Sequence, residues 1–279
     1  GTNLNKKYVI GTHVMWFEIE MYADFIDGMV NLLETVENKE NVTIDLCFNM
    51  LQHFEKVDTD KIKKHELLIK FKKGVATLED MGYVMWGETD SFFPKEAFQA
   101  IETLAKYTDE QGIHKYLLSF ADRKMWDSSW DSLVHVDYRD VKFIDDDNGH
   151  LYTNQAKSQL PIEEMNKINA KADEFDFGMI KQPKISGACL VLSADLIKFG
   201  VNIPSCLLYN DDEGLSIMCQ KLLGQDFMQF ICQNILHVHA RRHSQKRLYV
   251  KNEDNPHSFI GEKNNDFQEF LKLSKENIH

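Results

Sequence analysis

The run Tyr83-Val84-Met85-Trp86 is short and apolar, and it leads directly into Gly87-Glu88-Thr89-Asp90. Continuous hydrophobicity over a few residues is typical of a strand that is buried on both faces of a parallel sheet. The glycine and the polar residues that follow predict a loop. Ligands of open parallel sheets bind just beyond the carboxyl ends of the strands. We therefore expect a buried strand that ends at a functional loop.

Strand and helix patterns alternate on both sides of this run. Apolar, β-branched segments predict strands at 8–14, 42–48 and 117–120. Three- and four-residue spacing of apolar residues predicts helices at about 18–37, 58–73 and 98–104. This alternation predicts an α/β fold with a mostly parallel central sheet that helices flank on both faces.

The second half of the chain continues the alternation less regularly. An Asn148-Gly149 turn predicts a small antiparallel hairpin insertion over 141–152. Helices are expected at 162–172, at 194–199, from about 211 and at 266–275, and strands at 185–192, 227–232 and 235–239. Gly187 interrupts the first of these strands, which indicates close approach of a ligand or another backbone. No internal repeat or long linker divides the chain, so we expect 1–279 to form a single domain.

Composition narrows the class of protein. The chain has 279 residues, of which 43% are hydrophobic, and this composition excludes wholesale disorder. The formal charge of -12 argues against a general binder of polyanions. Five widely spaced cysteines without a CxxC motif indicate reduced thiols and a cytoplasmic location. No signal peptide and no apolar run of transmembrane length are evident, so we expect no stable membrane insertion.

Four polar constellations could carry chemistry. Glu88 and Asp90 could hold a divalent cation that bridges a diphosphate. Asp211 and Asp212 begin an amphipathic segment, where a carboxylate could accept a proton from a hydroxyl group. His237 and His239 share one face of a strand, and the basic run 241–247 could bind phosphate. Each constellation, taken alone, also has a structural explanation. Solvation of a loop or a surface explains Glu88, Asp90 and the basic run, helix capping explains Asp211 and Asp212, and a half-buried polar face explains the two histidines.

The order of these constellations along the chain, however, resembles GT-A glycosyltransferases, and in particular glycosyltransferase family 2. The resemblance covers about residues 7–250. Glu88-Thr89-Asp90 looks like the family's DxD motif, with glutamate in place of the first aspartate. Ser186-Gly187-Ala188 looks like the glycine-containing strand beside the acceptor. Asn210-Asp211-Asp212 looks like the Glu-Asp motif that supplies the catalytic base.

The resemblance implies a metal-dependent enzyme that moves a sugar from a nucleotide diphosphate sugar, with a UDP-sugar favoured, to an acceptor hydroxyl. It implies a nucleotide-sugar-binding half at 7–120, an acceptor-binding half at 121–250 and a C-terminal extension at 251–279. Asp212 would be the base of an inverting reaction, with Asp211 beside it. The remaining implied roles are metal binding (Mn²⁺ or Mg²⁺) by Asp90, Glu88, His237 or His239, donor binding by Thr12, Trp16, Asn49, Glu88, Arg242 and Lys246, and acceptor contacts by Trp86, Gly187 and Ala188.

Departures from the family pattern leave alternatives open. The first strand runs into Thr12-His13-Val14 and the second ends at Asn49, so the family's nucleotide-reading motifs are absent there. A retaining transferase, a nucleotidyltransferase or a non-catalytic nucleotide-binding module are the alternatives. The acceptor could be a glycan, a lipid-linked sugar, a protein or a modified DNA base.

Overall fold

The computed structural model describes residues 1–15, 22–49, 81–89, 91–123, 125, 128–139, 160–201, 211–222 and 226–238. Its strands are β1 (Lys7–Met15), β2 (Val42–Asn49), β3 (Met81–Gly87), β4 (Lys115–Ala121), β5 (Phe177–Ile180), β6 (Cys189–Ser193) and β7 (Phe227–Leu236). Its α-helices are α1 (Tyr22–Leu33), α3 (Ala97–Gln111), α5 (Ile162–Asn169), α6 (Ala194–Phe199) and α7 (Asp211–Gln220), and two 3₁₀ helices are η2 (Lys39–Asn41) and η4 (Ser128–Leu133).

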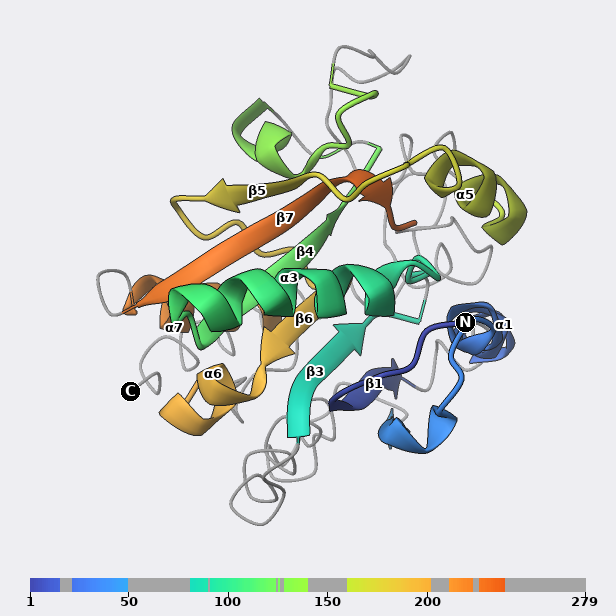
Figure 1. Ribbon diagram of the computed structural model, residues 1–279, viewed down its shortest axis with the longest axis horizontal. Coiled ribbons are helices and arrows are strands. Elements are labelled where there is room, and N and C mark those ends of the chain that lie inside the picture. Colours follow the sequence, from blue (N-terminus) through green and yellow to red (C-terminus); the bar gives the residue numbers. More distant parts are fainter. Residues whose placement is uncertain are drawn as a thin grey trace, which may run out of the picture.

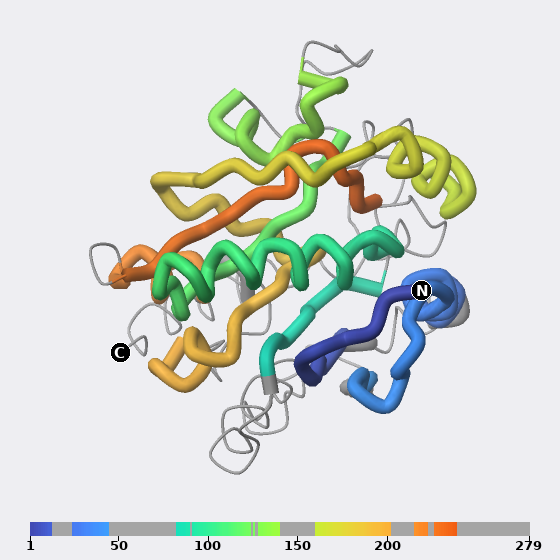
Figure 2. Tube along the Cα trace, in the orientation of Figure 1, coloured from blue at the N-terminus to red at the C-terminus, as the bar shows by residue number. Residues whose placement is uncertain are grey.

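The seven strands form one mixed sheet in the order β2-β1-β3-β6-β4-β7-β5 (Figure 1). The pairs β1/β2, β1/β3 and β4/β7 are parallel. Strand β6 is antiparallel to both of its neighbours, β3 and β4, and β5 is antiparallel to β7. Strand β7 therefore lies between β4 and the edge strand β5 (Figure 2). Five strands run in one direction and two run against them.

Helices cover both faces of the sheet because buried side chains alternate along each strand. Tyr8 and Ile10 belong to a core cluster with residues of α1 and α3, whereas Val9 belongs to a second cluster with residues of α6 and α7. The same alternation separates Tyr83 from Val84. The long helix α3 crosses the first face in Figure 1. The result is a three-layer α/β/α arrangement.

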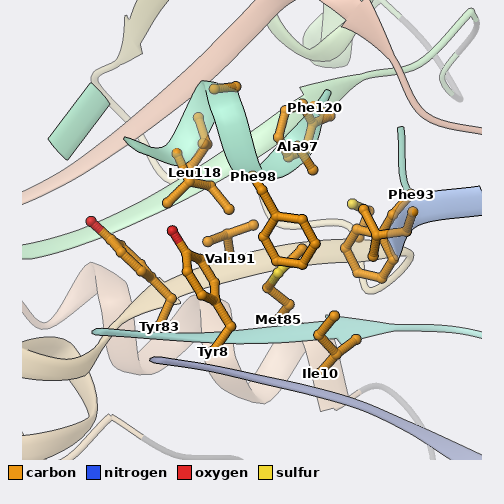
Figure 3. Close-up of a cluster of buried hydrophobic side chains, with 14 of the residues drawn as sticks. Tyr8, Ile10, Tyr83, Met85, Phe93, Ala97, Phe98, Leu118, Phe120 and Val191 are labelled. Carbon is orange, nitrogen blue, oxygen red and sulfur yellow. The ribbon is translucent and has the colours of Figure 1, made fainter. Parts of the chain in front are cut away.

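Aromatic side chains fill the layer below α3 (Figure 3). The Tyr8 ring stacks on Tyr83 with 5.3 Å between ring centroids and meets Phe98 edge-on at 5.0 Å. Each buried phenol is satisfied, because the Tyr8 hydroxyl donates to Glu102 Oε1 at 2.8 Å and Tyr83 and Tyr116 share a hydrogen bond. Such satisfaction is what makes buried hydroxyls tolerable in an apolar core.

The predicted α/β class and the central sheet between helices are confirmed, but the sheet is mixed rather than mostly parallel. The strand expected at 185–192 begins only at Cys189. The two strands expected at 227–232 and 235–239 are one strand, β7, whose register with β4 shifts between Phe120 and Ala121. The helices expected at 58–73 and 266–275 and the hairpin expected at 141–152 lie outside the described residues. Among the helices that the structure does describe, none has the length and hydropathy needed to cross a bilayer.

Candidate functional site

The candidate site lies at the edge of the sheet where β1, β2, β3, β4 and β7 end and where β5 and β6 begin, which we call the carboxyl edge. Strand β1 lies between β2 and β3 and is parallel to both. The chain passes from β1 to β2 on one side and then returns to place β3 on the other side of β1. Such a change of direction in the strand order is a topological switch point, where open α/β sheets bind ligands. The segment after β3 and the start of β6 meet beside it.

The segment after β3 is held by backbone hydrogen bonds. The Glu88 N–H donates to the Ala188 carbonyl at 3.2 Å, so the loop touches the residue that precedes β6. The Ser91 N–H donates to the Glu88 carbonyl at 3.0 Å and closes a turn. Gly87 is required at the start of this loop, because a Cβ there would lie 2.6 Å from the buried Phe93 ring. The Glu88 loop is therefore fixed by packing on both sides.

An isolated antiparallel bridge joins this loop to the end of β7. The Phe92 N–H donates to the Val238 carbonyl at 2.8 Å, and the Val238 N–H donates to the Phe92 carbonyl at 3.2 Å. Both side chains are buried and pack with Met165 of α5. The segment that follows the Glu88 loop and the segment that follows β7 are about 145 residues apart in the chain, and they consequently lie side by side at Phe92 and Val238.

His237 is buried at this bridge and has both ring nitrogens next to protein oxygens. Its Nδ1 lies 3.0 Å from the Phe120 carbonyl, which can only accept, so Nδ1 carries a proton. Its Nε2 lies 3.4 Å from Asp122 Oδ2, and both side chains are at least nine-tenths buried. The backbone N–H of His237 also donates to the Ala121 carbonyl at 2.9 Å. His237 thus ties the end of β7 to the end of β4.

Asp122 is itself anchored by the end of η4 and the residues that follow it. Its N–H donates to the Leu133 carbonyl and its carbonyl accepts from the His135 N–H, both at 2.8 Å. Burial lowers the pKa of His135, while the Asn234 backbone and Asp137 act in the opposite direction. The Asp137 N–H donates to His135 Nδ1 at 3.1 Å. Asp122 therefore belongs to a rigid, hydrogen-bonded corner.

The structure brings some of the predicted site residues to the carboxyl edge. Thr12 is fully buried, and its Oγ1 has no hydrogen-bond partner within the described part of the chain. Gly187 and Ala188 are buried beside the Glu88 loop. Trp86 is buried in the core cluster on the face of α6 and α7.

Other predicted site residues lie wholly or partly outside the described residues. Trp16, Asp90, His239, Arg242 and Lys246 lie outside the described residues. For Asn49, Asp211 and Asp212 the backbone is described, and their side chains lie outside the description. Within the described ranges, no group of three or more potential ligand residues could hold a metal ion. A complete metal site would need at least one ligand from outside those ranges.

Sequence reasoning missed Asp122 and Arg123 as members of this edge. They are the two residues that come after Ala121, the last residue of β4. Their only sequence signal is that position after the predicted strand at 117–120, since neither belongs to a recognisable motif. No protein-family model matches this chain, and no curated protein matches it in sequence.

Proposed function

We propose that this chain is a metal-dependent glycosyltransferase with the GT-A fold. It would move a sugar from a nucleotide diphosphate sugar, with a UDP-sugar favoured, to an acceptor hydroxyl with inversion at the anomeric carbon. The proposal is supported mainly by one observation: the loop carrying Glu88 contacts Ala188 on one side and is bridged through Phe92 to Val238 on the other. Three separate motifs of the resemblance thereby converge at one edge of the sheet.

The donor set fits a cation such as Mn²⁺ or Mg²⁺. Carboxylates suit both ions, and an imidazole suits Mn²⁺ better than Mg²⁺. Asp90 directly follows Thr89 and precedes Ser91, both of which are buried at the carboxyl edge. Once bound, the cation would neutralise the charge that develops on the diphosphate as the glycosidic bond breaks. Asp90 and Glu88 would hold the cation against that group.

Of the two candidate histidines, His239 is favoured as the metal ligand. Both ring nitrogens of His237 already face protein oxygens, those of Phe120 and Asp122. His239 directly follows Val238, whose backbone is bonded to Phe92. His237 would then act as a positioning residue that ties the end of β7 to the end of β4.

The position of α7 supports Asp212 as the base. Helix α7 begins at Asp211 and is joined to β7 by a short connection. Leu215 and Cys219 of α7 are buried in the core cluster that also contains side chains of β1, β3 and β6, so the helix that carries Asp212 packs on the sheet. Asp212 would accept the acceptor hydroxyl proton as that oxygen attacks the anomeric carbon.

Thermal melting of the full chain tests the proposal directly. UDP with Mn²⁺ should raise the melting temperature, and UDP without metal should raise it much less. GDP with Mn²⁺ serves as the comparison for base preference. If neither nucleotide shifts the melting temperature with or without Mn²⁺, the alternative of a protein without nucleotide-sugar chemistry is favoured.

Two substitutions separate metal binding from catalysis. Asp90→Ala should remove the Mn²⁺-dependent part of UDP binding, measured by calorimetry.

Asp212→Asn should keep UDP binding and lower the rate of transfer at least a hundredfold, since general-base catalysis contributes about 10²–10⁴-fold. Full transfer by Asp212→Asn would remove Asp212 from the base role, and an NMR assignment of the product anomer would distinguish inversion from retention.

A further inference from the structure

Arg123 lies at the carboxyl edge, and one nitrogen of its guanidinium group is buried without a hydrogen-bond partner among the described residues. It lies two residues after the end of β4, next to Asp122. Its Nη2 atom is buried and has no hydrogen-bond partner within the described residues. Burial lowers the pKa of Arg123, and Tyr138 and Asp122 act in the opposite direction. The side chain nevertheless stays charged, because arginine does not lose its proton in proteins.

A nearby arginine shows that acceptors are present in this part of the fold. Arg139 donates from Nε to the Val134 carbonyl at 3.2 Å and from Nη2 to Gln233 Oε1 at 2.7 Å. Arg139 is more exposed than Arg123, yet its donors are used. Arg139 thus finds acceptors close by, whereas Arg123 Nη2 lies where the described residues offer it none.

The carboxylate adjacent to Arg123 in sequence is directed elsewhere. Asp122 Oδ2 lies 3.4 Å from His237 Nε2, and no ion pair joins Arg123 to any residue in the described ranges. A buried donor left without an acceptor costs free energy, and the cost is larger for a charged group. A bound ion or ligand that supplies the missing acceptor explains such a group.

We infer that Arg123 binds an oxyanion of the ligand, of the phosphate type, at the carboxyl edge beside the end of β4. The planar guanidinium can donate two parallel hydrogen bonds to such a group. The inference relies on the proposed function only for the source of the oxyanion, which is either the diphosphate of the donor or an anionic group of the acceptor. The chain is net acidic, so the oxyanion must be attracted by this local charge rather than by the whole molecule.

Titration calorimetry with inorganic pyrophosphate and no metal tests the oxyanion site by itself. Wild type should bind pyrophosphate saturably, and Arg123→Gln should bind it at least tenfold more weakly. Arg139→Gln is the matched control and should stay within twofold of wild type. No binding by wild type, or equal affinity in Arg123→Gln and wild type, would overturn the inference.

Stability provides a second readout that a purely structural arginine would not give. Arg123→Met removes the unsatisfied buried donor, so its melting temperature without ligand should equal or exceed that of wild type. The rise in melting temperature that pyrophosphate causes in wild type should be absent in this variant. A marked fall in melting temperature with an unchanged pyrophosphate shift would assign Arg123 a structural role instead.

Titration with UDP, with and without Mn²⁺, identifies the source of the oxyanion. Weaker UDP binding by Arg123→Gln assigns the site to the donor diphosphate, whereas unchanged UDP binding with lost pyrophosphate binding assigns it to an anionic acceptor. Failure of wild type to bind any nucleotide would contradict the proposed function. The pyrophosphate result would still stand as evidence for the oxyanion site.

Discussion

The pair formed by His237 and Asp122 joins the ends of two parallel strands through side chains. The Nδ1 atom of His237 faces the Phe120 carbonyl, and its Nε2 atom lies 3.4 Å from Asp122 Oδ2. Both side chains are buried, so removing one partner leaves the other poorly solvated.

We predict that Asp122→Asn destabilises the protein by about 3 kcal/mol, because it leaves the buried imidazole without its carboxylate. Urea unfolding measures this change. The matched control is Asp195→Asn, which alters a pair with His114 at 3.9 Å in which the side chains are 62% and 49% exposed. The control should change stability by less than about 1 kcal/mol. Equal effects of the two substitutions would mean that burial of the His237 pair contributes nothing.

Glu96 gives a pH-dependent prediction at the start of α3. Burial raises the pKa of its carboxyl group, although its own backbone, Lys95 and Asn169 act in the opposite direction. A raised pKa means that the folded protein binds this proton more tightly than the unfolded chain, so ionisation at neutral pH costs stability. Glu96→Gln should therefore stabilise the protein at pH 7.5.

The advantage of Glu96→Gln should shrink as the pH falls through the raised pKa, and it should vanish near the ordinary glutamate value of about 4.3. Urea unfolding at several pH values measures the difference from wild type. Glu110→Gln, on the exposed side of the same helix, should change stability little at any of them. A constant difference between Glu96→Gln and wild type across pH would contradict this account.

Among the elements, α5 is attached to β7 by the side-chain amide of Asn169, which pairs with the backbone of one β7 residue as a neighbouring strand would. Asn169 Nδ2 donates to the Leu236 carbonyl at 2.8 Å, and Asn169 Oδ1 accepts from the Leu236 N–H at 2.7 Å. All four atoms belong to residues with at most 1% exposure. This contact lies where the register of β7 shifts, so it stabilises the end of β7 from which His237 follows.

Asn169→Ala should destabilise the protein by about 2–4 kcal/mol, because it leaves the N–H and the carbonyl of Leu236 buried and unpaired. Asn166→Ala is the control on the same helix. The side-chain amide of Asn166 bonds that of Asn31, and this contact is only partly buried. The control should cost about 1 kcal/mol or less. Chemical denaturation ranks the two variants, and the opposite order would show that the amide does not hold β7.

The strands differ in how well the sequence predicts them. Strands with continuous apolar runs, such as β1 and β3, were predicted within two residues because burial on both faces leaves a strong local signal. Strand β5 was not predicted, because Phe177–Ile180 is short, contains a glycine and pairs only at the sheet edge. The sequence predicted one strand ending at 232 and another beginning at 235, whereas β7 is continuous, and only its pairing with β4 skips the three residues between Cys232 and Leu236.

The candidate site was predictable only where a motif marked it. Glu88, Ala188 and His237 were singled out from their order along the chain, and all three lie at the carboxyl edge, while their roles in a site stay predictions. Asp122 and Arg123 belong to no motif. The importance of Asp122 depends on its contact with His237, and that of Arg123 on the lack of an acceptor for Nη2 among the described residues. Contacts of this kind join residues more than 100 positions apart, so no local pattern encodes them.

At the scale of the whole molecule, the two expected halves share one sheet. Strand β6, from the half at 121–250, lies between β3 and β4, which belong to the half at 7–120. Val191 of β6 is 1% exposed, is paired with both Met85 and Leu118, and packs in the cluster below α3. Neither half can complete its hydrogen bonding or its core without the other, so we expect them to unfold together.

Val191→Ala tests this coupling through hydrogen exchange. Truncating the buried valine should cost about 2 kcal/mol, and this cost should appear in every amide that exchanges only by global unfolding. The slowest amides of β1 and of β7 should therefore lose protection by the same factor, roughly 30-fold, since each 1.4 kcal/mol is tenfold. Val30→Ala, at a valine that is 66% exposed on α1, should leave protection almost unchanged. If the amides of β7 lose protection while those of β1 keep it, the halves unfold separately, and the carboxyl edge would then join two independent units instead of crossing one.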